Sequence, residues 1–340
     1  MVRKPSVHAF LLKRILLLIP SLIGVTVMVF VISHVVPADP VGIALGPEAT
    51  QEQINAMREA WGLNKPLYVQ YGIFLKNLVQ GDLGYSLVSK RAVTEELSYY
   101  FPATFELTTA SMILSIILGI FIGIVSAVYR NRLFDHLTRT YCLFGISMPV
   151  FWLGLLLLLL FYVKLGWLPG GGRIADGIQV ERLSGFLILD SLLTGNWEAL
   201  GSALLHLVLP AFCLSSSFLA TISRIARSSV LQVIREDYVR TARAKGVPEF
   251  LVMGKHVLRN SLLPVITISG ILYGQLLGGA VLTETIFSWP GMGRYVVRSI
   301  LHLDFQPILG FTVLVAVLYA LANLAVDLLY SVVNPQVRLE

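Results

Sequence analysis

Six long runs of the sequence contain no Asp, Glu, Lys or Arg, and each is about 22 to 25 residues long. The runs lie between Arg14 and Asp39, Glu106 and Arg130, Arg139 and Lys164, Glu198 and Arg224, Arg259 and Glu284, and Asp304 and Asp327. A helix rises about 1.5 Å per residue and a bilayer core is about 30 Å thick, so roughly 20 apolar residues span it. We therefore expect an all-α, polytopic membrane protein with six transmembrane helices.

The composition supports a membrane protein. The 340 residues are 56% hydrophobic and 14% charged, whereas soluble domains carry roughly 25% charged residues. This excludes a disordered chain, a collagen-like chain and a disulfide scaffold, and it argues against an ordinary soluble enzyme. The net charge of +6 then indicates cations at a membrane face rather than binding to nucleic acid. Cys142 and Cys213 lie in apolar runs, and we expect both to be small buried side chains.

Lys and Arg concentrate in alternate connections between the runs. They occur in the N-terminus (Arg3, Lys4, Lys13, Arg14), the second-to-third connection (Arg130, Arg132, Arg139) and the fourth-to-fifth connection (Arg224, Arg227, Arg235, Arg240, Arg243, Lys245, Lys255, Arg259). By the positive-inside rule, both termini are expected in the cytoplasm. The first apolar run exceeds the roughly 7–15 residues of a signal-peptide core, so we expect an uncleaved anchor.

These assignments divide the chain into three parts. Residues 1–36 hold the cytoplasmic N-terminus and the first helix, 37–100 an external segment, and 101–340 the transmembrane core with a cytoplasmic loop at 224–262. Within the external segment, residues 49–61 predict a short amphipathic helix with Thr50 as N-cap. The external segment is therefore expected to be a small folded cap.

Motifs of common enzyme sites are missing from the sequence. It contains no G-x-x-x-x-G-K-[ST], H-E-x-x-H, C-x-x-C or G-x-S-x-G, so we expect no ATP-phosphate loop, no metal site and no enzymatic activity on this chain. His206 is the one histidine at predicted membrane depth, and we expect it to be neutral and bonded to a neighbour. Glu106 and Glu284 at outer helix ends and Asp327 at the inner face are expected to be interfacial.

Small residues and prolines recur within the predicted helices. Helix two contains Gly119 and Gly123 in a G-x-x-x-G pattern, which lets helix backbones approach closely. Helix five contains Gly270, Gly274, Gly278 and Gly279. The prolines Pro20, Pro149, Pro210 and Pro264 are expected to bend helices or to mark their starts. These residues fit either a moving permeation path or simple helix packing, and the sequence leaves both open.

The fourth-to-fifth connection is too long and too regular for a plain turn. Helix-forming residues over 230–245 predict a basic helix, Gly246 is placed to end it with left-handed backbone, and Pro248 prevents its continuation. A short basic helix that ends in a sharp turn could dock into a groove of a partner protein, or it could lie on anionic lipid. Physical argument from these residues leaves both interpretations open.

Several sequence blocks resemble one family of proteins. The blocks are EDYVRTARAKG at 236–246, RNSLLP at 259–264, GDLGYS at 81–86, SMPVFW at 147–152, LTETIFSWPGMG at 282–293, VDLLY at 326–330 and VNP at 333–335. Together they resemble permease subunits of bacterial ATP-binding-cassette importers, in the dipeptide, oligopeptide and nickel branch. Arg240, Thr241 and Ala242 stand where the wider importer family has Glu-Ala-Ala, which weakens a sugar or amino-acid assignment.

The resemblance implies a type I importer fold and a multi-pass subunit of the bacterial inner membrane. Its implied partners are a second related permease subunit, two ATP-binding subunits, an external substrate-binding protein and membrane lipid, with no nucleic acid. ATP and Mg would be on the partner subunits, with no cofactor on this chain. The subunit would form half of a pore for di- or oligopeptides or related small solutes, and the exact substrate stays open. The alternative class is a secondary transporter or channel not driven by ATP, which would predict inverted repeats or intramembrane charge pairs.

The resemblance also implies two groups of site residues. The helix that couples the ATPases to the pore would comprise Asp237, Tyr238, Arg240, Thr241, Ala242, Arg243, Ala244, Lys245, Gly246 and Pro248. A second group, Glu284, Phe287, Trp289, Pro290 and Arg294, suggests a rigid turn near the outer mouth. We expect that turn to contact the binding protein or the substrate path, and an aromatic anchor at the membrane interface is the open alternative.

Overall fold

The computed structural model describes residues 7–35, 41, 45, 49–60 and 62–333, and within them it contains helices, turns and one isolated bridge but no strand. The all-α prediction is therefore confirmed for the part of the chain that is described. The helices are α1 (Val7–Val35), α3 (Gln51–Ala60), α4 (Leu67–Val79), α5 (Val93–Val128), α6 (Leu133–Ser147), α7 (Val150–Leu157), η1 (Leu158–Lys164), α8 (Leu187–Leu193), α9 (Trp197–Val233), α10 (Asp237–Ala244), α11 (Glu249–Leu251), η2 (Val252–Leu258), α12 (Arg259–Gly279), α13 (Val281–Ile286), α14 (Met292–Leu301) and α15 (Phe305–Val333). The π-helical stretches η1 and η2 continue α7 and α11. Arg3, Lys4 and the VNP block beyond residue 333 lie outside the described residues.

Four of the helices are long and apolar enough to cross a membrane. They are α5, α9, the continuous α11–η2–α12 helix and α15 up to Val326, and they cover the second, fourth, fifth and sixth charge-free runs. The first run lies in α1, whose fully described apolar stretch, Leu16–Ile32, is shorter than the roughly 20 residues a bilayer needs. The described chain thus supports a multi-pass membrane protein, and the count of six spans stays a prediction.

The third run does not form the single spanning helix expected of it. It forms two helices, α6 and the α7–η1 helix, which meet at an angle of 108°. The bend lies at Met148, whose backbone is extended with ψ 126°, because a residue that precedes proline is disfavoured in helical conformation. Pro149 then caps the start of α7. The expectation that Pro149 bends a helix or marks its start is confirmed.

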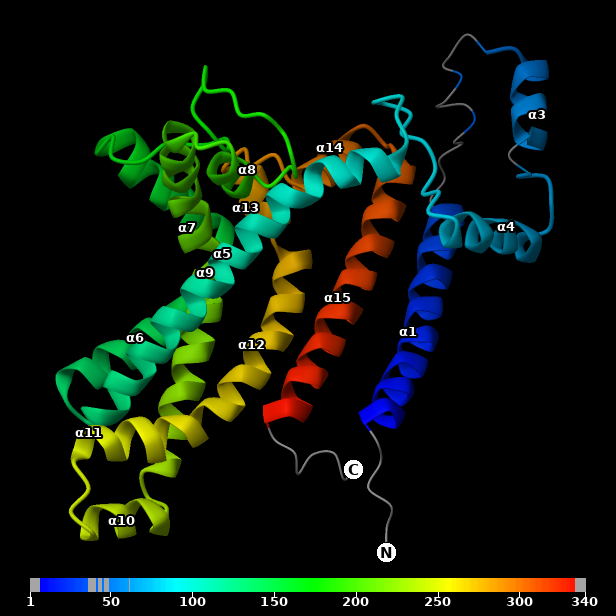
Figure 1. Ribbon diagram of the computed structural model, residues 1–340. Coiled ribbons are helices and arrows are strands. Elements are labelled where there is room, and N and C mark those ends of the chain that lie inside the picture. The colour runs from blue at the N-terminus through cyan, green and yellow to red at the C-terminus, as the bar shows by residue number, and fades with distance from the viewer. Residues whose placement is uncertain (1–6, 36–40, 42–44, 46–48, 61, 334–340) are drawn as a thin grey trace, which may run out of the picture.

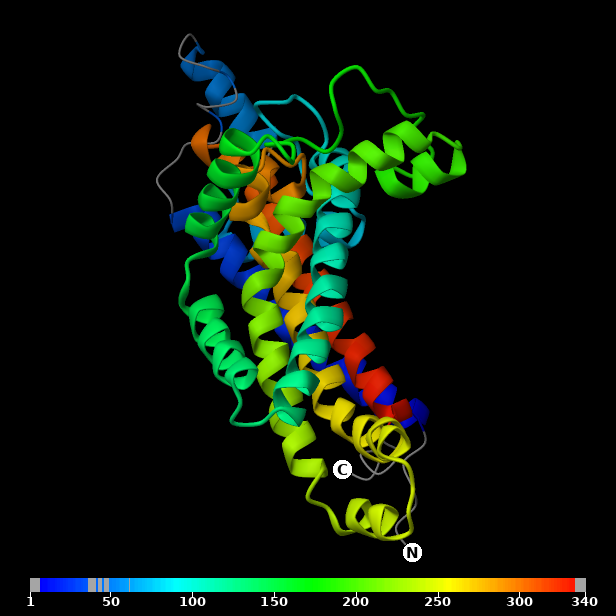
Figure 2. The same cartoon turned by 90° about the vertical axis from the view of Figure 1, so that its left-hand side faces the viewer.

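The long helices run side by side between two opposite ends of the molecule (Figures 1 and 2). The first described turn of α1, the last described turn of α15, and α10 all lie at one end, which we call the α10 end. Helices α3, α4, α8, α13 and α14 lie at the opposite end, which we call the α14 end. α4 runs across the end of α1, where the Phe30 ring packs against Tyr71 at 5.3 Å. Helix α5 begins at Val93, so the predicted boundary at residue 100 falls inside it.

The most extensive helix packing joins α5 to α9. A Cβ atom added to Gly123 would lie 2.6 Å from the backbone oxygen of Ser223 and 2.7 Å from Cβ of Ala226. One added to Gly119 would lie 2.8 Å from the Ile222 side chain. Only glycine leaves room for such an approach, so the G-x-x-x-G prediction of close backbone packing is confirmed.

Apolar side chains around this seam form the main core. The buried members are Ala103, Leu107, Met112, Leu207, Ala211, Leu214, Ile222, Ala226, Val265, Leu272, Leu276, Ala280 and Trp289. Both cysteines are buried and unbonded to one another, as expected. The short helix predicted over 49–61 with Thr50 as N-cap is confirmed as α3. Thr50 N–H donates to Gln53 Oε1 (2.9 Å) and Gln53 N–H donates to Thr50 Oγ1 (3.3 Å), a reciprocal cap at the start of the helix.

Candidate functional site

Helix α10 forms a separate short element after α9. The single helix predicted over 230–245 is wrong, because α9 ends at Val233 and a turn separates it from α10. The predicted end of the helix is confirmed: Gly246 has φ +75°, and the backbone N–H of Val247 donates to the carbonyl of Ala242 (3.2 Å). Left-handed backbone of this kind is favourable for glycine and strained for side-chain-bearing residues. The chain therefore closes α10 sharply and turns into α11 at Pro248.

Two side chains attach α10 to the rest of the chain. Val239 is 0% exposed and Ala242 is 7% exposed, and their spacing of three places both on one helix face. They pack in a cluster with Ala127 of α5, Val230 of α9 and Val257 of η2. Ala242 therefore lies on the inner face of α10 rather than on the surface offered to a partner.

The opposite face of α10 is open. Its exposed residues are Asp237, Tyr238, Arg240, Thr241, Arg243 and Ala244, followed by Lys245, Gly246 and Pro248; we call these nine residues the α10 surface. Phe250, which is 74% exposed, and Leu251 stand directly beyond it on α11. An exposed phenylalanine next to a polar, mostly basic helix is typical of a contact surface, and Phe250 lies outside the motif at 237–248 from which the site was predicted.

Polar contacts fix the position of α10. The Arg243 guanidinium makes a two-pronged ion pair with Glu249 of α11, with Nη2–Oε1 at 2.6 Å and Nε–Oε2 at 3.1 Å. Asn260 Nδ2 donates to the Tyr238 hydroxyl (2.8 Å), and that hydroxyl donates to the carbonyl of His256 (3.3 Å). These bonds join α10 to the start of α12, so displacement of α10 would be transmitted to that helix.

A buried ion pair braces the same end of α9. Asp135 of α6 is fully buried and accepts hydrogen bonds from Arg227 Nε (2.6 Å) and Nη2 (2.9 Å). The Ser126 hydroxyl and the backbone N–H of Asn131 also donate to this carboxylate. A buried carboxylate with four hydrogen bonds and an opposite charge is well satisfied. The α5–α6 turn, α6 and α9 are thereby joined near α10.

At the α14 end, residues 284–294 form a tight turn between α13 and α14, which we call the outer turn. Glu284 is fully buried, and its Oε1 accepts a hydrogen bond from the Thr104 hydroxyl of α5 (2.7 Å). Its Oε2 accepts a hydrogen bond from the Arg294 backbone N–H (3.0 Å). The same Thr104 oxygen accepts from the backbone N–H of Met292 (2.8 Å). The carboxyl group therefore lies inside the turn, and the interfacial membrane depth expected for Glu284 stays a prediction.

Two aromatic residues of the outer turn are also buried. Trp289 is 1% exposed and donates from Nε1 to the carbonyl of Ala103 in α5 (2.8 Å). Phe287 packs with Leu157 of α7 and Cys213 of α9. Their burial gives them the role of fixing the turn to α5, α7 and α9. Because both rings are buried, neither is accessible to a binding protein or to the headgroup region of a membrane.

Two other predicted residues of the outer turn remain accessible. Arg294 is exposed, and its guanidinium donates to the carbonyl of Ser288 (2.7 Å). Pro290 is partly exposed and lines a pocket of about 180 Å³ together with Tyr99 and Arg182. The contact with a binding protein or with the substrate path stays a prediction. Pro290, Arg294 and the residues around them are the ones accessible for it.

Ionisable groups near membrane depth have local partners. His206 Nδ1 lies 2.8 Å from the carbonyl oxygen of Ser202, which agrees with the expected neighbour bond. Glu106 pairs with Arg173 at 2.5 Å and accepts a hydrogen bond from the backbone N–H of Ile188 (2.9 Å), which ties the segment between η1 and α9 to α5. Among the described residues, no group of three His, Cys, Asp or Glu side chains could hold a metal ion.

Comparison with known proteins gives two family matches that together cover most of the chain. The family described as "Binding-protein-dependent transport system inner membrane component" matches residues 119–339, and its N-terminal companion matches residues 7–108. The chain is 44% identical to a dipeptide transport system permease protein, DppB, of Alkalihalophilus pseudofirmus, over 97% of this chain and 99% of that protein. It is 47% identical to a probable D,D-dipeptide transport system permease protein, DdpB, of Escherichia coli (92% and 93%), and 44% identical to a glutathione transport system permease protein, GsiC, of Pectobacterium atrosepticum (97% and 98%).

Proposed function

Because the chain belongs to the family of binding-protein-dependent transport system inner membrane components, we propose that it forms half of an ATP-driven import pore for di- or oligopeptides. The chain is a transport permease component of a multi-pass inner-membrane system. Relatives named for dipeptides and for glutathione share an amide-linked, zwitterionic class of solute. Their names support a peptide substrate over a sugar.

The proposed assembly contains a second permease subunit, two ATP-binding subunits and an external binding protein. ATP and Mg belong to the ATP-binding subunits, and this chain needs no cofactor of its own. Both termini and α10 lie in the cytoplasm, and α3, α4 and the outer turn lie outside. The placement of α1, α15 and α10 at one end of the molecule, together with the cation-rich connections, supports this orientation.

One observation carries the coupling proposal. Helix α10 is anchored by Val239 and Ala242, exposes the α10 surface, and is bonded to α11 and the start of α12. ATP-driven closure of the partner subunits would push α10, and its ties to α12 would pass the movement to the pore. Coupling requires that the ATPases bind the two pore states with different affinity. Arg294 and Pro290 of the outer turn are proposed to face the docked binding protein.

The substrate class is tested by uptake in cells that lack this gene. Labelled dipeptides, tripeptides, glutathione and a nickel chelate are supplied separately, with and without the gene restored. We expect only the peptide signals to depend on this chain. Restored uptake of the nickel chelate alone would contradict the peptide assignment.

The coupling role is tested at two neighbouring alanines. Ala244→Glu changes the exposed face of α10 and should leave the chain folded in the membrane while reducing substrate-stimulated ATP hydrolysis about tenfold or more, as loss of a central contact does. Ala242→Glu instead places a charge in the buried face and should lower the membrane level of the chain. Asn55→Glu on exposed α3 is the matched control. Full ATP hydrolysis and uptake in Ala244→Glu would refute the docking role.

A further inference from the structure

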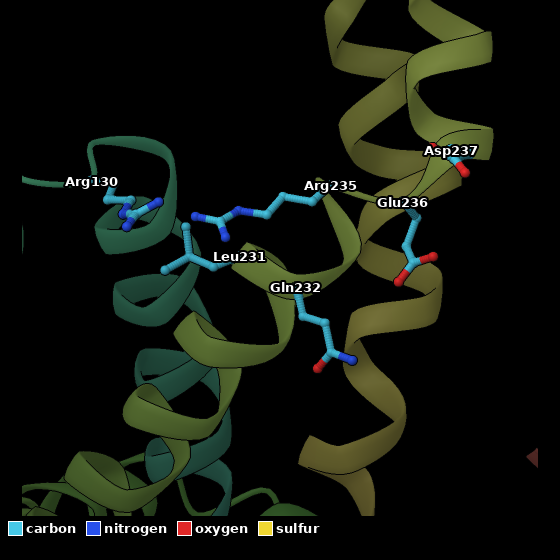
Figure 3. A pocket seen from close by; sticks show the side chains of 6 residues that line it. All are labelled: Arg130, Leu231, Gln232, Arg235, Glu236 and Asp237. Carbon is cyan, nitrogen blue, oxygen red and sulfur yellow. The ribbon is translucent and has the colours of Figure 1, made fainter.

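A pocket of about 540 Å³ opens at the α10 end, between the α5–α6 turn and the junction of α9 and α10. Its lining residues are Arg130, Leu231, Gln232, Arg235, Glu236 and Asp237. Figure 3 shows the guanidinium groups of Arg130 and Arg235 pointing toward one another, with Leu231 between them. Glu236 and Gln232 point away from this pair, so the two cations form one wall of the pocket.

The two arginines have no acidic partner within the part of the chain that the structure describes. Nearby cations do: Arg227 pairs with the buried Asp135 at 2.6 Å, and Arg243 pairs with Glu249 at 2.6 Å. Two like charges that converge repel one another unless an anion lies between them. The geometry of the pocket therefore fits a group with negatively charged oxygens that both guanidinium forks can reach.

The position of the pocket indicates where such a group comes from. Arg130 lies two residues after the last residue of the apolar helix α5, Val128, at the level where a bilayer changes from hydrocarbon to headgroups. Beside it, α6 presents Leu133, which is 75% exposed, and Leu137 one turn further along the same face. A phosphate at the arginines would thus stand at the head of an apolar strip long enough for part of an acyl chain.

We propose that this pocket binds the phosphate headgroup of an anionic phospholipid from the cytoplasmic leaflet, with Arg130 and Arg235 as its ligands. The proposal rests on the orientation given under Proposed function. The exposed apolar strip on α6 favours lipid over an acidic segment of an ATPase, which would need no such strip. Arg235 lies two residues before Asp237, the first residue of α10. Bound lipid would therefore link the α5–α6 turn to the start of α10 and restrain the movement of α10.

The test uses the complete purified transporter and phosphatidylglycerol as the probe. Lipid retention is measured by native mass spectrometry for the wild type, Arg130→Gln, Arg235→Gln and the double variant. Loss of one charge-assisted contact is expected to weaken retention about tenfold, and the double variant more. Arg132→Gln is the matched control, because Arg132 stacks over the Tyr129 ring at 5.5 Å and does not line the pocket. Its retention should equal that of the wild type.

Further measurements distinguish the phospholipid from free phosphate and from a protein contact in the same pocket. Equal retention of phosphatidylglycerol by wild type and double variant overturns the proposal. Displacement of the lipid by millimolar inorganic phosphate identifies a free-phosphate site and also overturns it. Unchanged retention with loss of the ATP-binding subunits from the double variant assigns the pocket to a protein contact instead. Failure of the proposed function would appear as absent peptide uptake in the wild type, which lipid retention does not report.

Discussion

Two buried carboxylates in this protein are stabilised by different means. Asp135 lies against the guanidinium of Arg227, so its charge is compensated. Glu284 has no cationic side chain bonded to it among the described residues, and it depends on the Thr104 hydroxyl and the backbone N–H groups of Gly293 and Arg294. Burial raises the pKa of Glu284 to about 7, and these hydrogen bonds offset only part of that effect. The outer turn therefore contains a group that titrates near neutrality.

Glu284 gives the outer turn a defined pH dependence. Its pKa rises from 4.5 to about 7 on folding, so the folded state binds the proton more tightly. The stabilisation is fully present below pH 4.5 and is lost as the pH rises through about 7. We expect the purified subunit to melt at higher temperature at pH 5.5 than at pH 8. Glu284→Gln should reduce this difference, and an unchanged difference in that variant would assign the pH effect to other groups.

The partners of Glu284 explain why its burial was not predicted from the sequence. Thr104 lies 180 positions away along the chain, and no local pattern links the two residues. The sequence suggested a rigid turn from Trp289 and Pro290, and the turn exists. Whether the aromatic rings of the turn are buried or exposed depends on α5 and α7. These helices lie beside the rings only in the tertiary fold.

At the scale of single elements, local signals succeeded where a specific residue dictates the backbone. Gly246 adopts left-handed backbone that most other residues disfavour, and Pro149 disfavours helical backbone at Met148. Both predicted boundaries are confirmed. The break at 234–236 carries no glycine or proline, so the pattern of helix-forming residues extended across it. That break arises because Val239 and Ala242 pack into a shared cluster with α5 and η2. Tertiary packing therefore overrides helix propensity at this position.

The α5–α9 seam makes a prediction about helix packing. Gly123→Leu should destabilise the subunit by about 1–3 kcal/mol or more, because the added side chain meets α9 backbone, which cannot yield as a flexible side chain does. The measurement is the melting temperature of the purified subunit. Gly201→Leu on α9 is the control, since nothing lies within 4 Å of a Cβ added there. Equal melting of the two variants would contradict a close seam.

For the whole molecule, the charge-free runs predicted the helical class and the order of the apolar helices. They could not predict helix ends, because α5 already includes Glu95 and Glu96 before its apolar run, and α9 continues past Arg227 after its own. Charge marks where a helix leaves hydrocarbon, whereas the helix itself ends where its packing ends. The position of α4 relative to α1 depends on contacts such as the hydrogen bond between Thr26 and Tyr71, which no periodicity encodes.

The two ends of the molecule yield a test of orientation. Glu52→Cys on exposed α3 should react with a membrane-impermeant thiol reagent in cells with a permeable outer layer, and Lys245→Cys beyond α10 should react only after the inner membrane is opened. The buried Cys142 and Cys213 should contribute little background labelling. Labelling of Lys245→Cys from outside would reverse the proposed orientation.

The bend at Met148 gives the third apolar run two attachments. Helix α6 is held near α10 through Asp135, while α7 meets the outer turn, where a Cβ on Gly154 would lie 3.3 Å from the Phe287 ring. A straight helix over the same residues would have to release one of these anchors. Movement of one end of the transporter relative to the other should therefore change the backbone angles mainly at Met148 and Pro149. Helices α6 and α7 would each keep their packing contacts.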